Sequence, residues 1–258
     1  MGLLNGRFAA ITGAAGPRGL GRAMAQIFAE HGATVAILDL NAAEAQAVAA
    51  ELGPDHVGLA CDVTDKAACD AAIADLIARW GRIDILVNNA GITQPLKLME
   101  IAAANYDAVL DVNLRGTLYA SQAAIPQMRA QGAGSIVNIS SVATAGVNRV
   151  PYSAAKGGVN ALTRSIAMEY SGSGIRINAV APGGTEAPPR LTPRNDEQPS
   201  EQEKAWYQQV VDQTVASSLM RRYGTLAEQA NAILFLASDE ASYITGVTIP
   251  VSGGKSKG

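Results

Sequence analysis

The stretch ITGAAGPRGLGRA, residues 11–23, decides the fold of this 258-residue chain. It follows an apolar run, RFAAIT (7–12), that is typical of a buried strand, and it opens a helical pattern that ends at Gly32. Gly13, Gly19 and Gly21 lack side chains, so the backbone can turn tightly and approach a pyrophosphate, which the helix N-terminus then stabilises. Glycines also serve ordinary tight turns, so this stretch predicts a dinucleotide site only together with its context.

The same strand-then-helix order continues along the chain. Short β-branched runs such as TVAILDL (34–40) alternate with longer alanine-rich helical patterns, and a last helix and strand follow residues 181–209. Near-continuous apolar strands that alternate with helices indicate a parallel sheet covered on both faces. We therefore expect one α/β domain over residues 1–258, a Rossmann fold with a doubly wound parallel sheet of about seven strands.

Composition narrows the class of protein. Hydrophobic residues make up 48% and charged residues 17%, which permits a sizeable core, and a net charge of -3 without basic blocks argues against nucleic acid or an anionic membrane as partner. No apolar run reaches the length of a signal core or a membrane span. The two cysteines, Cys61 and Cys69, and two isolated histidines predict neither disulfides nor a metal site. A soluble cytoplasmic enzyme is the expectation.

Three strand ends carry candidate cofactor residues. Asp39 ends the second strand, where a carboxylate can accept hydrogen bonds from an adenosine ribose and would repel a 2′-phosphate, so it favours NAD over NADP. Arg18 in the glycine loop favours the opposite choice, because a guanidinium can pair with that phosphate. CDVT (61–64) puts Asp62 near the adenine edge, and NNAG (88–91) puts Asn89 and Gly91 where ligands of open α/β sheets gather.

A tyrosine and a lysine define the candidate chemistry. In VPYSAAKGG (150–158), Tyr152 and Lys156 are four residues apart on a predicted helix and so share one face. A neighbouring ammonium favours the phenolate, which makes a tyrosine usable as a base for an alcohol proton. Before the pair, NISS (138–141) offers Ser140 or Ser141 at the sheet edge, and LDVNLRG (110–116) places an amide, Asn113, inside a helix.

Taken in order, TGAAGPRGLG, Asp62, NNAG, Asn113, NISS, YSAAK and APGG resemble the motifs of the short-chain dehydrogenase/reductase family over essentially the whole chain. The resemblance implies a catalytic tetrad of Asn113, Ser141, Tyr152 and Lys156. Tyr152 would be the acid/base, Ser141 would hold the substrate oxygen, Lys156 would bind the nicotinamide ribose, and Asn113 would support a proton-relay water. It also implies a homotetramer with the late helices packed across subunits.

The cofactor contacts expected in full are Gly13, Arg18, Gly19, Leu20, Gly21, Asp39, Asp62, Val63, Asn89, Gly91, Tyr152, Lys156, Pro182, Gly183 and Thr185. Two departures from the family pattern leave alternatives open. Five residues separate Gly13 from Gly19 where the family has three, so either Gly16 or Gly19 supplies the close approach. The loop from Ser141 to Tyr152 is short, so Ser140 stays an alternative to Ser141.

Residues from about 184 to 222 correspond to the family's substrate lid. Their sequence, together with SSVATAGVNRVPY (140–152) and SSLMRRYGT (217–225), is similar to that of dehydrogenases that oxidise cis-dihydrodiol carboxylates to catechols with NAD. Arg190 and Arg194 are candidates for a clamp on the substrate carboxylate, or they are solvated loop charges. Asn148 and Arg149, just before Tyr152, are further candidates for substrate contact. Trp206 is expected to pack the lid down.

The leading hypothesis is thus NAD-dependent oxidation of a ring-borne secondary alcohol. The alternative within enzymes is a 3-oxoacyl-(acyl-carrier-protein) reductase or general carbonyl reductase, against which Asp39 counts modestly. A dinucleotide-binding sensor is the alternative outside enzymes, but it has no need of an activated phenol.

Overall fold

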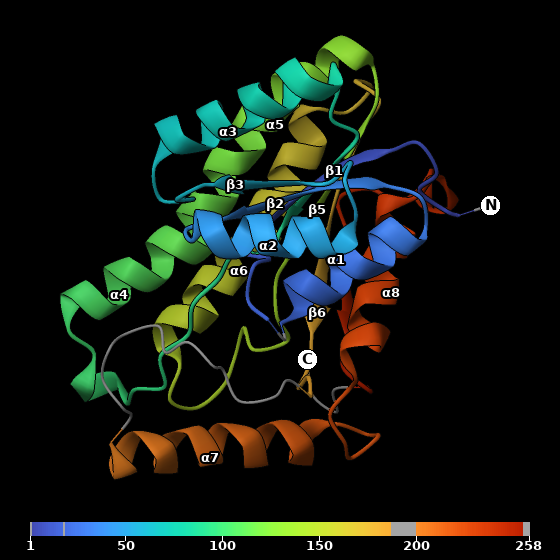
Figure 1. The fold of residues 1–258 in the computed structure, drawn as a ribbon. Helices are drawn as coiled ribbons and strands as arrows, with labels where there is room; N and C mark the ends of the chain where they lie inside the picture. Colours follow the sequence, from blue (N-terminus) through green and yellow to red (C-terminus); the bar gives the residue numbers. More distant parts are fainter. Residues whose placement is uncertain (1, 18, 187–199, 255–258) are drawn as a thin grey trace.

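A single parallel sheet organises the protein (Figure 1). The computed structural model describes residues 2–17, 19–186 and 200–254, and within them seven strands run in the order β3-β2-β1-β4-β5-β6-β7. The strands are β1 (Phe8–Thr12), β2 (Thr34–Asp39), β3 (Val57–Ala60), β4 (Ile85–Asn88), β5 (Gly134–Ile139), β6 (Ile175–Pro182) and β7 (Thr248–Val251). All neighbouring pairs are parallel, and the strand order reverses direction between β1 and β4. The predicted doubly wound sheet is confirmed, and its switch point is where ligands of such sheets bind.

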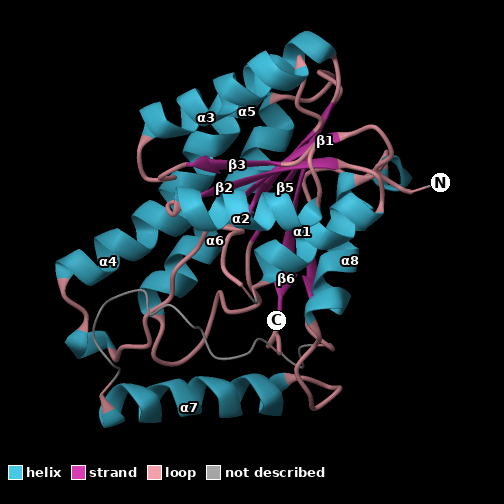
Figure 2. Ribbon diagram, in the orientation of Figure 1, coloured by secondary structure: helices cyan, strands magenta, loops and turns pink. Residues whose placement is uncertain are grey.

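Helices cover both faces of the sheet (Figure 2). They are α1 (Leu20–Glu30), α2 (Ala42–Leu52), α3 (Lys66–Trp80), α4 (Ala103–Leu110), α5 (Gly116–Gln131), α6 (Val150–Glu169), α7 (Glu201–Ser217) and α8 (Leu226–Ala237), with single turns η1 (Leu98–Glu100), η2 (Asp111–Arg115) and η3 (Asp239–Ala241). The side chains of α1, α2 and α8 share one buried cluster, and those of α3, α5 and α6 share the other. α7 lies apart from both layers (Figure 1).

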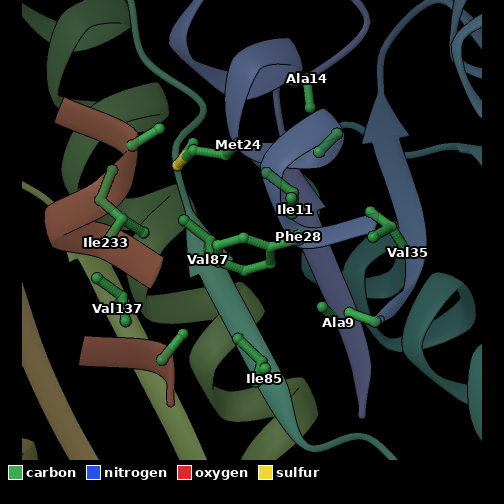
Figure 3. Close-up of a cluster of buried hydrophobic side chains, with 14 of the residues drawn as sticks. Ala9, Ile11, Ala14, Met24, Phe28, Val35, Ile85, Val87, Val137 and Ile233 are labelled. Atoms are coloured by element: carbon green, nitrogen blue, oxygen red, sulfur yellow. The ribbon is translucent and has the colours of Figure 1, made fainter. Parts of the chain in front are cut away.

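Alternation along the strands builds the two clusters. On β1, Ala9 and Ile11 face the α1 side, whereas Ala10 between them faces the α3 side. Figure 3 shows the α1 side, where Met24 and Phe28 of α1 pack over the sheet next to α8. Because both faces are buried, the strands are apolar at nearly every position, which is why their sequences predicted a parallel sheet.

The helix expected around Asn113 is α4, η2 and α5 in succession, and η2 is a π-helical turn. Another difference concerns β3, which ends at Ala60, so Asp62 lies in a turn beyond the strand. The stretch 181–209 contains the start of α7, and Trp206 on that helix is 9% exposed.

The two ends of the segment that carries α7 lie side by side. Gly224 N donates to Gly184 O at 2.8 Å, and Glu186 N donates to Gly224 O at 2.8 Å. Thr185 and Gly224 therefore form a short parallel bridge that joins the two ends of the segment. No helix of the described part of the chain is long and apolar enough to cross a membrane. Within the same residues, no group of three His, Cys, Asp or Glu side chains could hold a metal ion.

Candidate active site

The glycine loop between β1 and α1 has the backbone geometry that its sequence predicts. Gly13 has a φ of 64°, and a Cβ there would lie 2.6 Å from Ala90 Cα. A Cβ on Gly21 would lie 2.7 Å from Ala14 Cα and 2.8 Å from Gly13 O, so a side chain would separate α1 from the loop. Both positions therefore need glycine for close packing of the backbone.

The N-terminus of α1 is suited to an anion. Gly19 is its N-cap and makes no side-chain cap hydrogen bond among the described residues, and the first turn holds no acidic residue. A Cβ on Gly16 or on Gly19 would meet no described atom within 4 Å, so both glycines border open space and both remain candidates for the close approach to a pyrophosphate. Leu20 starts the helix and is half-buried, whereas Arg18 lies outside the described residues.

Two side chains hold the loop against β4. Thr12 Oγ1 accepts hydrogen bonds from Asn89 N at 3.0 Å and Ala90 N at 3.1 Å. The amide of Asn89 donates to Thr12 O at 2.9 Å and Gly13 O at 2.8 Å. The side-chain amide of Asn89, a predicted cofactor contact, thus hydrogen-bonds the backbone of the loop and holds its shape. Thr12 was missed, and its only sequence signal is its position directly before Gly13.

Asp39, Asp62 and Val63 lie at the same edge of the sheet. Asp39 Oδ2 accepts a hydrogen bond from Ala15 N at 2.9 Å, so the carboxylate at the end of β2 is fixed against the glycine loop. Asp62 Oδ1 accepts from Thr64 N at 2.9 Å, which closes the turn after β3. Val63 is buried beneath Gly116, where a Cβ would lie 2.7 Å from Val63 Cγ2. The bond from Ala15 joins the ends of β1 and β2, and Cys61 N, which donates to Asp39 O at 2.8 Å, joins the end of β3 to them.

Tyr152 and Lys156 occupy the first turns of α6, whose start is set by Pro151. Lys156 is 3% exposed; its Nζ donates to Ile139 O at 2.6 Å and lies 5.6 Å from the centroid of the Tyr152 ring. The spacing of four residues therefore brings a buried ammonium beside a phenol, as the sequence predicted.

The two adjacent serines face different ways. Ser140 Oγ donates to Lys156 O at 3.2 Å and also to Asn160, so its hydroxyl serves the packing of α6 on β5. Ser141 lines the same cavity as Tyr152, and its Oγ accepts from Ala143 N at 3.0 Å. The geometry thus favours Ser141 over Ser140 as the residue next to Tyr152.

Asn113 lies in the π-helical turn η2 and is fully buried. Its Nδ2 donates to Ile92 O at 2.8 Å and to Val109 O at 2.9 Å, whereas its Oδ1 has no hydrogen-bond partner among the described residues. A Cβ on Gly91 would lie 2.7 Å from this Oδ1 and 3.6 Å from Lys156 Nζ. The vacant acceptor therefore faces the region of Gly91 and Lys156, where it can accept a hydrogen bond from a water or ligand.

A cavity of about 250 Å³ joins these elements. Ser141 and Tyr152 line it together with the expected nicotinamide contacts Pro182, Gly183 and Thr185. α7 closes another side with Tyr207, Val210 and Thr214. Tyr223 also lines the cavity, and burial raises the pKa of its phenol. No sequence pattern pointed to Tyr223.

The predicted substrate residues divide into three groups. Asn148, with a φ of 56°, gives its amide to α7, donating to Trp206 O at 3.2 Å and Gln209 Oε1 at 2.8 Å. Arg149 lines the cavity. Arg190 and Arg194 lie outside the described residues.

A glycine loop on a doubly wound sheet, with a tyrosine in a cavity at the carboxyl ends of its strands and a buried lysine beside that tyrosine, defines a dinucleotide-dependent oxidoreductase. The family model described as enoyl-(acyl carrier protein) reductase matches residues 13–256. The chain belongs to the short-chain dehydrogenase/reductase family, and it is an oxidoreductase that acts on CH–OH groups.

Individual relatives cover nearly the whole chain. A 1,6-dihydroxycyclohexa-2,4-diene-1-carboxylate dehydrogenase from Pseudomonas putida is 49% identical, with 96% of this chain and 92% of the relative covered. One of the same name from Acinetobacter baylyi is 46% identical, with coverage of 95% and 94%. The crystal structure of a 3-ketoacyl-(acyl-carrier-protein) reductase from Brucella melitensis, complexed with NADH, is 33% identical, with a TM-score of 0.85 and coverage of 98% and 99%.

Proposed function

We propose that this chain oxidises a ring-borne secondary alcohol with NAD, and that its substrate is a cis-dihydrodiol carboxylate of the kind named for the Pseudomonas putida and Acinetobacter baylyi relatives. The observation that carries the proposal is the cavity shared by Ser141 and Tyr152, with the buried Lys156 beside the phenol. Identity of 49% and 46% over nearly the full length supports the substrate class.

In the proposed reaction Tyr152 removes the proton of the substrate hydroxyl, and Ser141 Oγ hydrogen-bonds the same oxygen. The ammonium of Lys156 favours the phenolate of Tyr152 electrostatically. The vacant Oδ1 of Asn113 holds a water through which the proton leaves the site. NAD, when bound, would accept the hydride that leaves the carbinol carbon.

The glycine loop, with the N-terminus of α1, would hold the pyrophosphate of the cofactor. Pro182, Gly183 and Thr185 would meet its nicotinamide end, since they line the cavity beside Tyr152. The fixed carboxylate of Asp39 supports NAD over NADP, because a 2′-phosphate near it would be repelled.

Residues from about 184 to 222 form the proposed substrate lid. The bridge between Thr185 and Gly224 provides a base for it, and the cavity contacts of Tyr207 and Val210 support a wall against the substrate ring. Closure of such a segment over a bound ligand would exclude water from the hydride transfer.

The assembly and location are part of the same proposal. We expect a cytoplasmic homotetramer in which the late elements pack across subunits. The exposure of Phe235, Tyr243 and Val247, which are apolar or aromatic side chains near the C-terminal end, supports such a contact. Sedimentation analysis tests the tetramer, and a monomer at micromolar concentration would exclude it.

A 3-oxoacyl-(acyl-carrier-protein) reductase is the second candidate, supported by the likeness to the Brucella melitensis enzyme. The deciding experiment compares kcat/KM for 1,6-dihydroxycyclohexa-2,4-diene-1-carboxylate with NAD, a neutral cis-dihydrodiol and an aryl alcohol with NAD, and a 3-oxoacyl thioester with NADH or NADPH. We expect the carboxylated diol with NAD to be the best pair and Tyr152→Phe to abolish most of its turnover. A thioester with NADPH as the best pair would instead identify the reductase.

A further inference from the structure

Arg149 is the only charged side chain among the described residues that line the cavity. It directly precedes α6 as the N-cap residue and lies three positions before Tyr152. The remaining lining residues are neutral, and they include the phenols Tyr207 and Tyr223 and the apolar Val210. The cavity is thus neutral and partly aromatic except for one positive charge. A neutral alcohol would not require that charge in its binding site.

The guanidinium of Arg149 is incompletely satisfied. Its Nε is buried and has no hydrogen-bond partner among the described residues, while its Nη2 donates to the neutral Gln213 Oε1 at 3.3 Å. The ion pairs of the described residues do not include Arg149. A half-buried cation without a counter-ion among the described residues is costly, so an anion that binds beside it recovers the lost solvation.

Electrostatics agrees with this geometry. Burial lowers the pKa of the Arg149 guanidinium, and the phenols of Tyr152 and Tyr223 oppose this shift. Arginine nevertheless stays protonated at neutral pH, because its pKa starts above 12. The charge therefore remains in the cavity and is close enough to Tyr152 to interact with it.

The backbone around Arg149 holds the side chain in place. A Cβ on Gly146 would lie 2.6 Å from Arg149 Nε, so the guanidinium packs directly over this glycine. On the preceding residue, Asn148, the left-handed φ of 56° is kept by hydrogen bonds to α7. Leu96 N also donates to Asn148 O at 2.9 Å. The cation is thus positioned before any ligand arrives, which reduces the entropy lost on binding.

We propose that Arg149 binds the substrate carboxylate and selects ring diols that carry a carboxylate on the carbon next to the reacting one. This inference rests on the proposed function. In a 1,6-dihydroxycyclohexa-2,4-diene-1-carboxylate, C1 bears both a hydroxyl and the carboxylate and has no hydrogen, so hydride can leave only from C6. The C6 hydroxyl at Tyr152 then puts the carboxylate on the neighbouring carbon, within the cavity that Arg149 also lines. A guanidinium can pair with both carboxylate oxygens.

The test compares two substrates in the full-length enzyme with NAD: the carboxylated diol, and the neutral cis-1,2-dihydroxycyclohexa-3,5-diene. Arg149→Gln should lower kcat/KM for the carboxylated diol by about 10- to 150-fold, mostly through KM, and change the value for the neutral diol by less than about threefold. Arg149→Lys keeps the positive charge but cannot pair with both carboxylate oxygens, so its kcat/KM for the carboxylated diol should lie between those of wild type and Arg149→Gln. Equal losses on both substrates would overturn the proposal.

Two further variants separate the carboxylate contact from general effects. Arg79→Gln removes one positive charge from the exposed side of α3, where Arg79 pairs with Asp75, and should leave both substrates unaffected. Gly146→Ala keeps the charge of Arg149 but displaces its guanidinium, so it should reproduce the selective loss. A selective loss in Arg79→Gln equal to that in Arg149→Gln would assign the effect to net charge and overturn the contact.

Direct binding makes the result independent of turnover. Salicylate carries a carboxylate next to a ring hydroxyl and gives up no hydride, so its affinity for the NADH complex can be measured by calorimetry and compared with that of catechol. Wild type should prefer salicylate, and Arg149→Gln should lose that preference. If wild type does not oxidise the carboxylated diol but salicylate binding still depends on Arg149, the proposed function fails and the anion site stands. Salicylate binding that is indifferent to Arg149 removes the site.

Discussion

Replacing Asn113 with alanine tests the link between the π-helical turn and catalysis. The change removes two hydrogen bonds, from Nδ2 to Ile92 O at 2.8 Å and to Val109 O at 2.9 Å. Each such bond contributes about 1 kcal/mol net. Oδ1 has no partner among the described residues, so its removal costs no protein hydrogen bond. We expect Asn113→Ala to lower the free energy of unfolding by about 2 kcal/mol, measured by urea denaturation.

The catalytic effect should exceed what this destabilisation explains. Loss of Oδ1 removes the acceptor that faces Gly91 and Lys156, and with it the proposed relay water. Proton transfer by a positioned group contributes about 10²- to 10⁴-fold to rate, so kcat should fall by at least about 10²-fold. The affinity for NADH, followed by fluorescence titration of the folded variant, should change by less than about threefold.

Thr117→Val is the matched control. Thr117 lies one helical turn beyond Asn113, is buried, and donates to Asn113 O at 2.9 Å. Its loss should lower the free energy of unfolding by about 1 kcal/mol and leave kcat within about twofold of wild type. The reasoning is refuted if Asn113→Ala keeps a kcat close to wild type, or if its loss of activity is matched by an equal loss of NADH affinity.

Three other outcomes are expected. Asp39→Ser should lower the ratio of kcat/KM for NAD to that for NADP by at least about tenfold, because it removes the charge that repels a 2′-phosphate; an unchanged ratio would contradict this role. Gly21→Ala should destabilise the free protein by about 1–3 kcal/mol in urea denaturation, since its Cβ would lie 2.7 Å from Ala14 Cα, and should weaken NADH binding in a fluorescence titration. The hydrogen bond from Arg222 and, to a smaller extent, the one from the backbone N–H of Thr225 lower the pKa of the Glu228 carboxyl from 4.5 to about 2. Its carboxylate therefore stabilises the fold above pH 4.5, and the advantage of wild type over Glu228→Gln should shrink as the pH falls from there towards about 2; a constant difference in acid titrations would disprove it.

Local sequence patterns predicted the architecture and much of the candidate site. Strands buried on both faces must be apolar throughout, so their sequences indicated the parallel sheet. Residue type and spacing are enough to predict short-range backbone geometry. They therefore predicted the conformation of Gly13 and the shared helix face of Tyr152 and Lys156. Asp62 was expected at the end of a strand, but it belongs to a turn held by its own side chain, since β3 ends at Ala60.

Other features depend on contacts between distant residues, which spacing along the chain does not reveal. Ser140 and Ser141 are equivalent in the sequence, and only the packing of α6 on β5 turns one hydroxyl towards Asn160 and leaves the other in the cavity. The sequence offered Arg149, Arg190 and Arg194 alike as substrate contacts; Arg149 lines the cavity, and the other two lie outside the described residues.

The sequence by itself determined the doubly wound sheet, the dinucleotide loop and the tyrosine–lysine pair, because these follow from periodicity and from residues within one helical turn of each other. Only the tertiary structure decided which serine lines the cavity with Tyr152, where the vacant oxygen of Asn113 points, and that Arg149 reaches the same cavity. Those outcomes depend on how α6, η2 and α7 pack around the ends of the strands, and burial of side chains from several elements, rather than any local pattern, sets that packing.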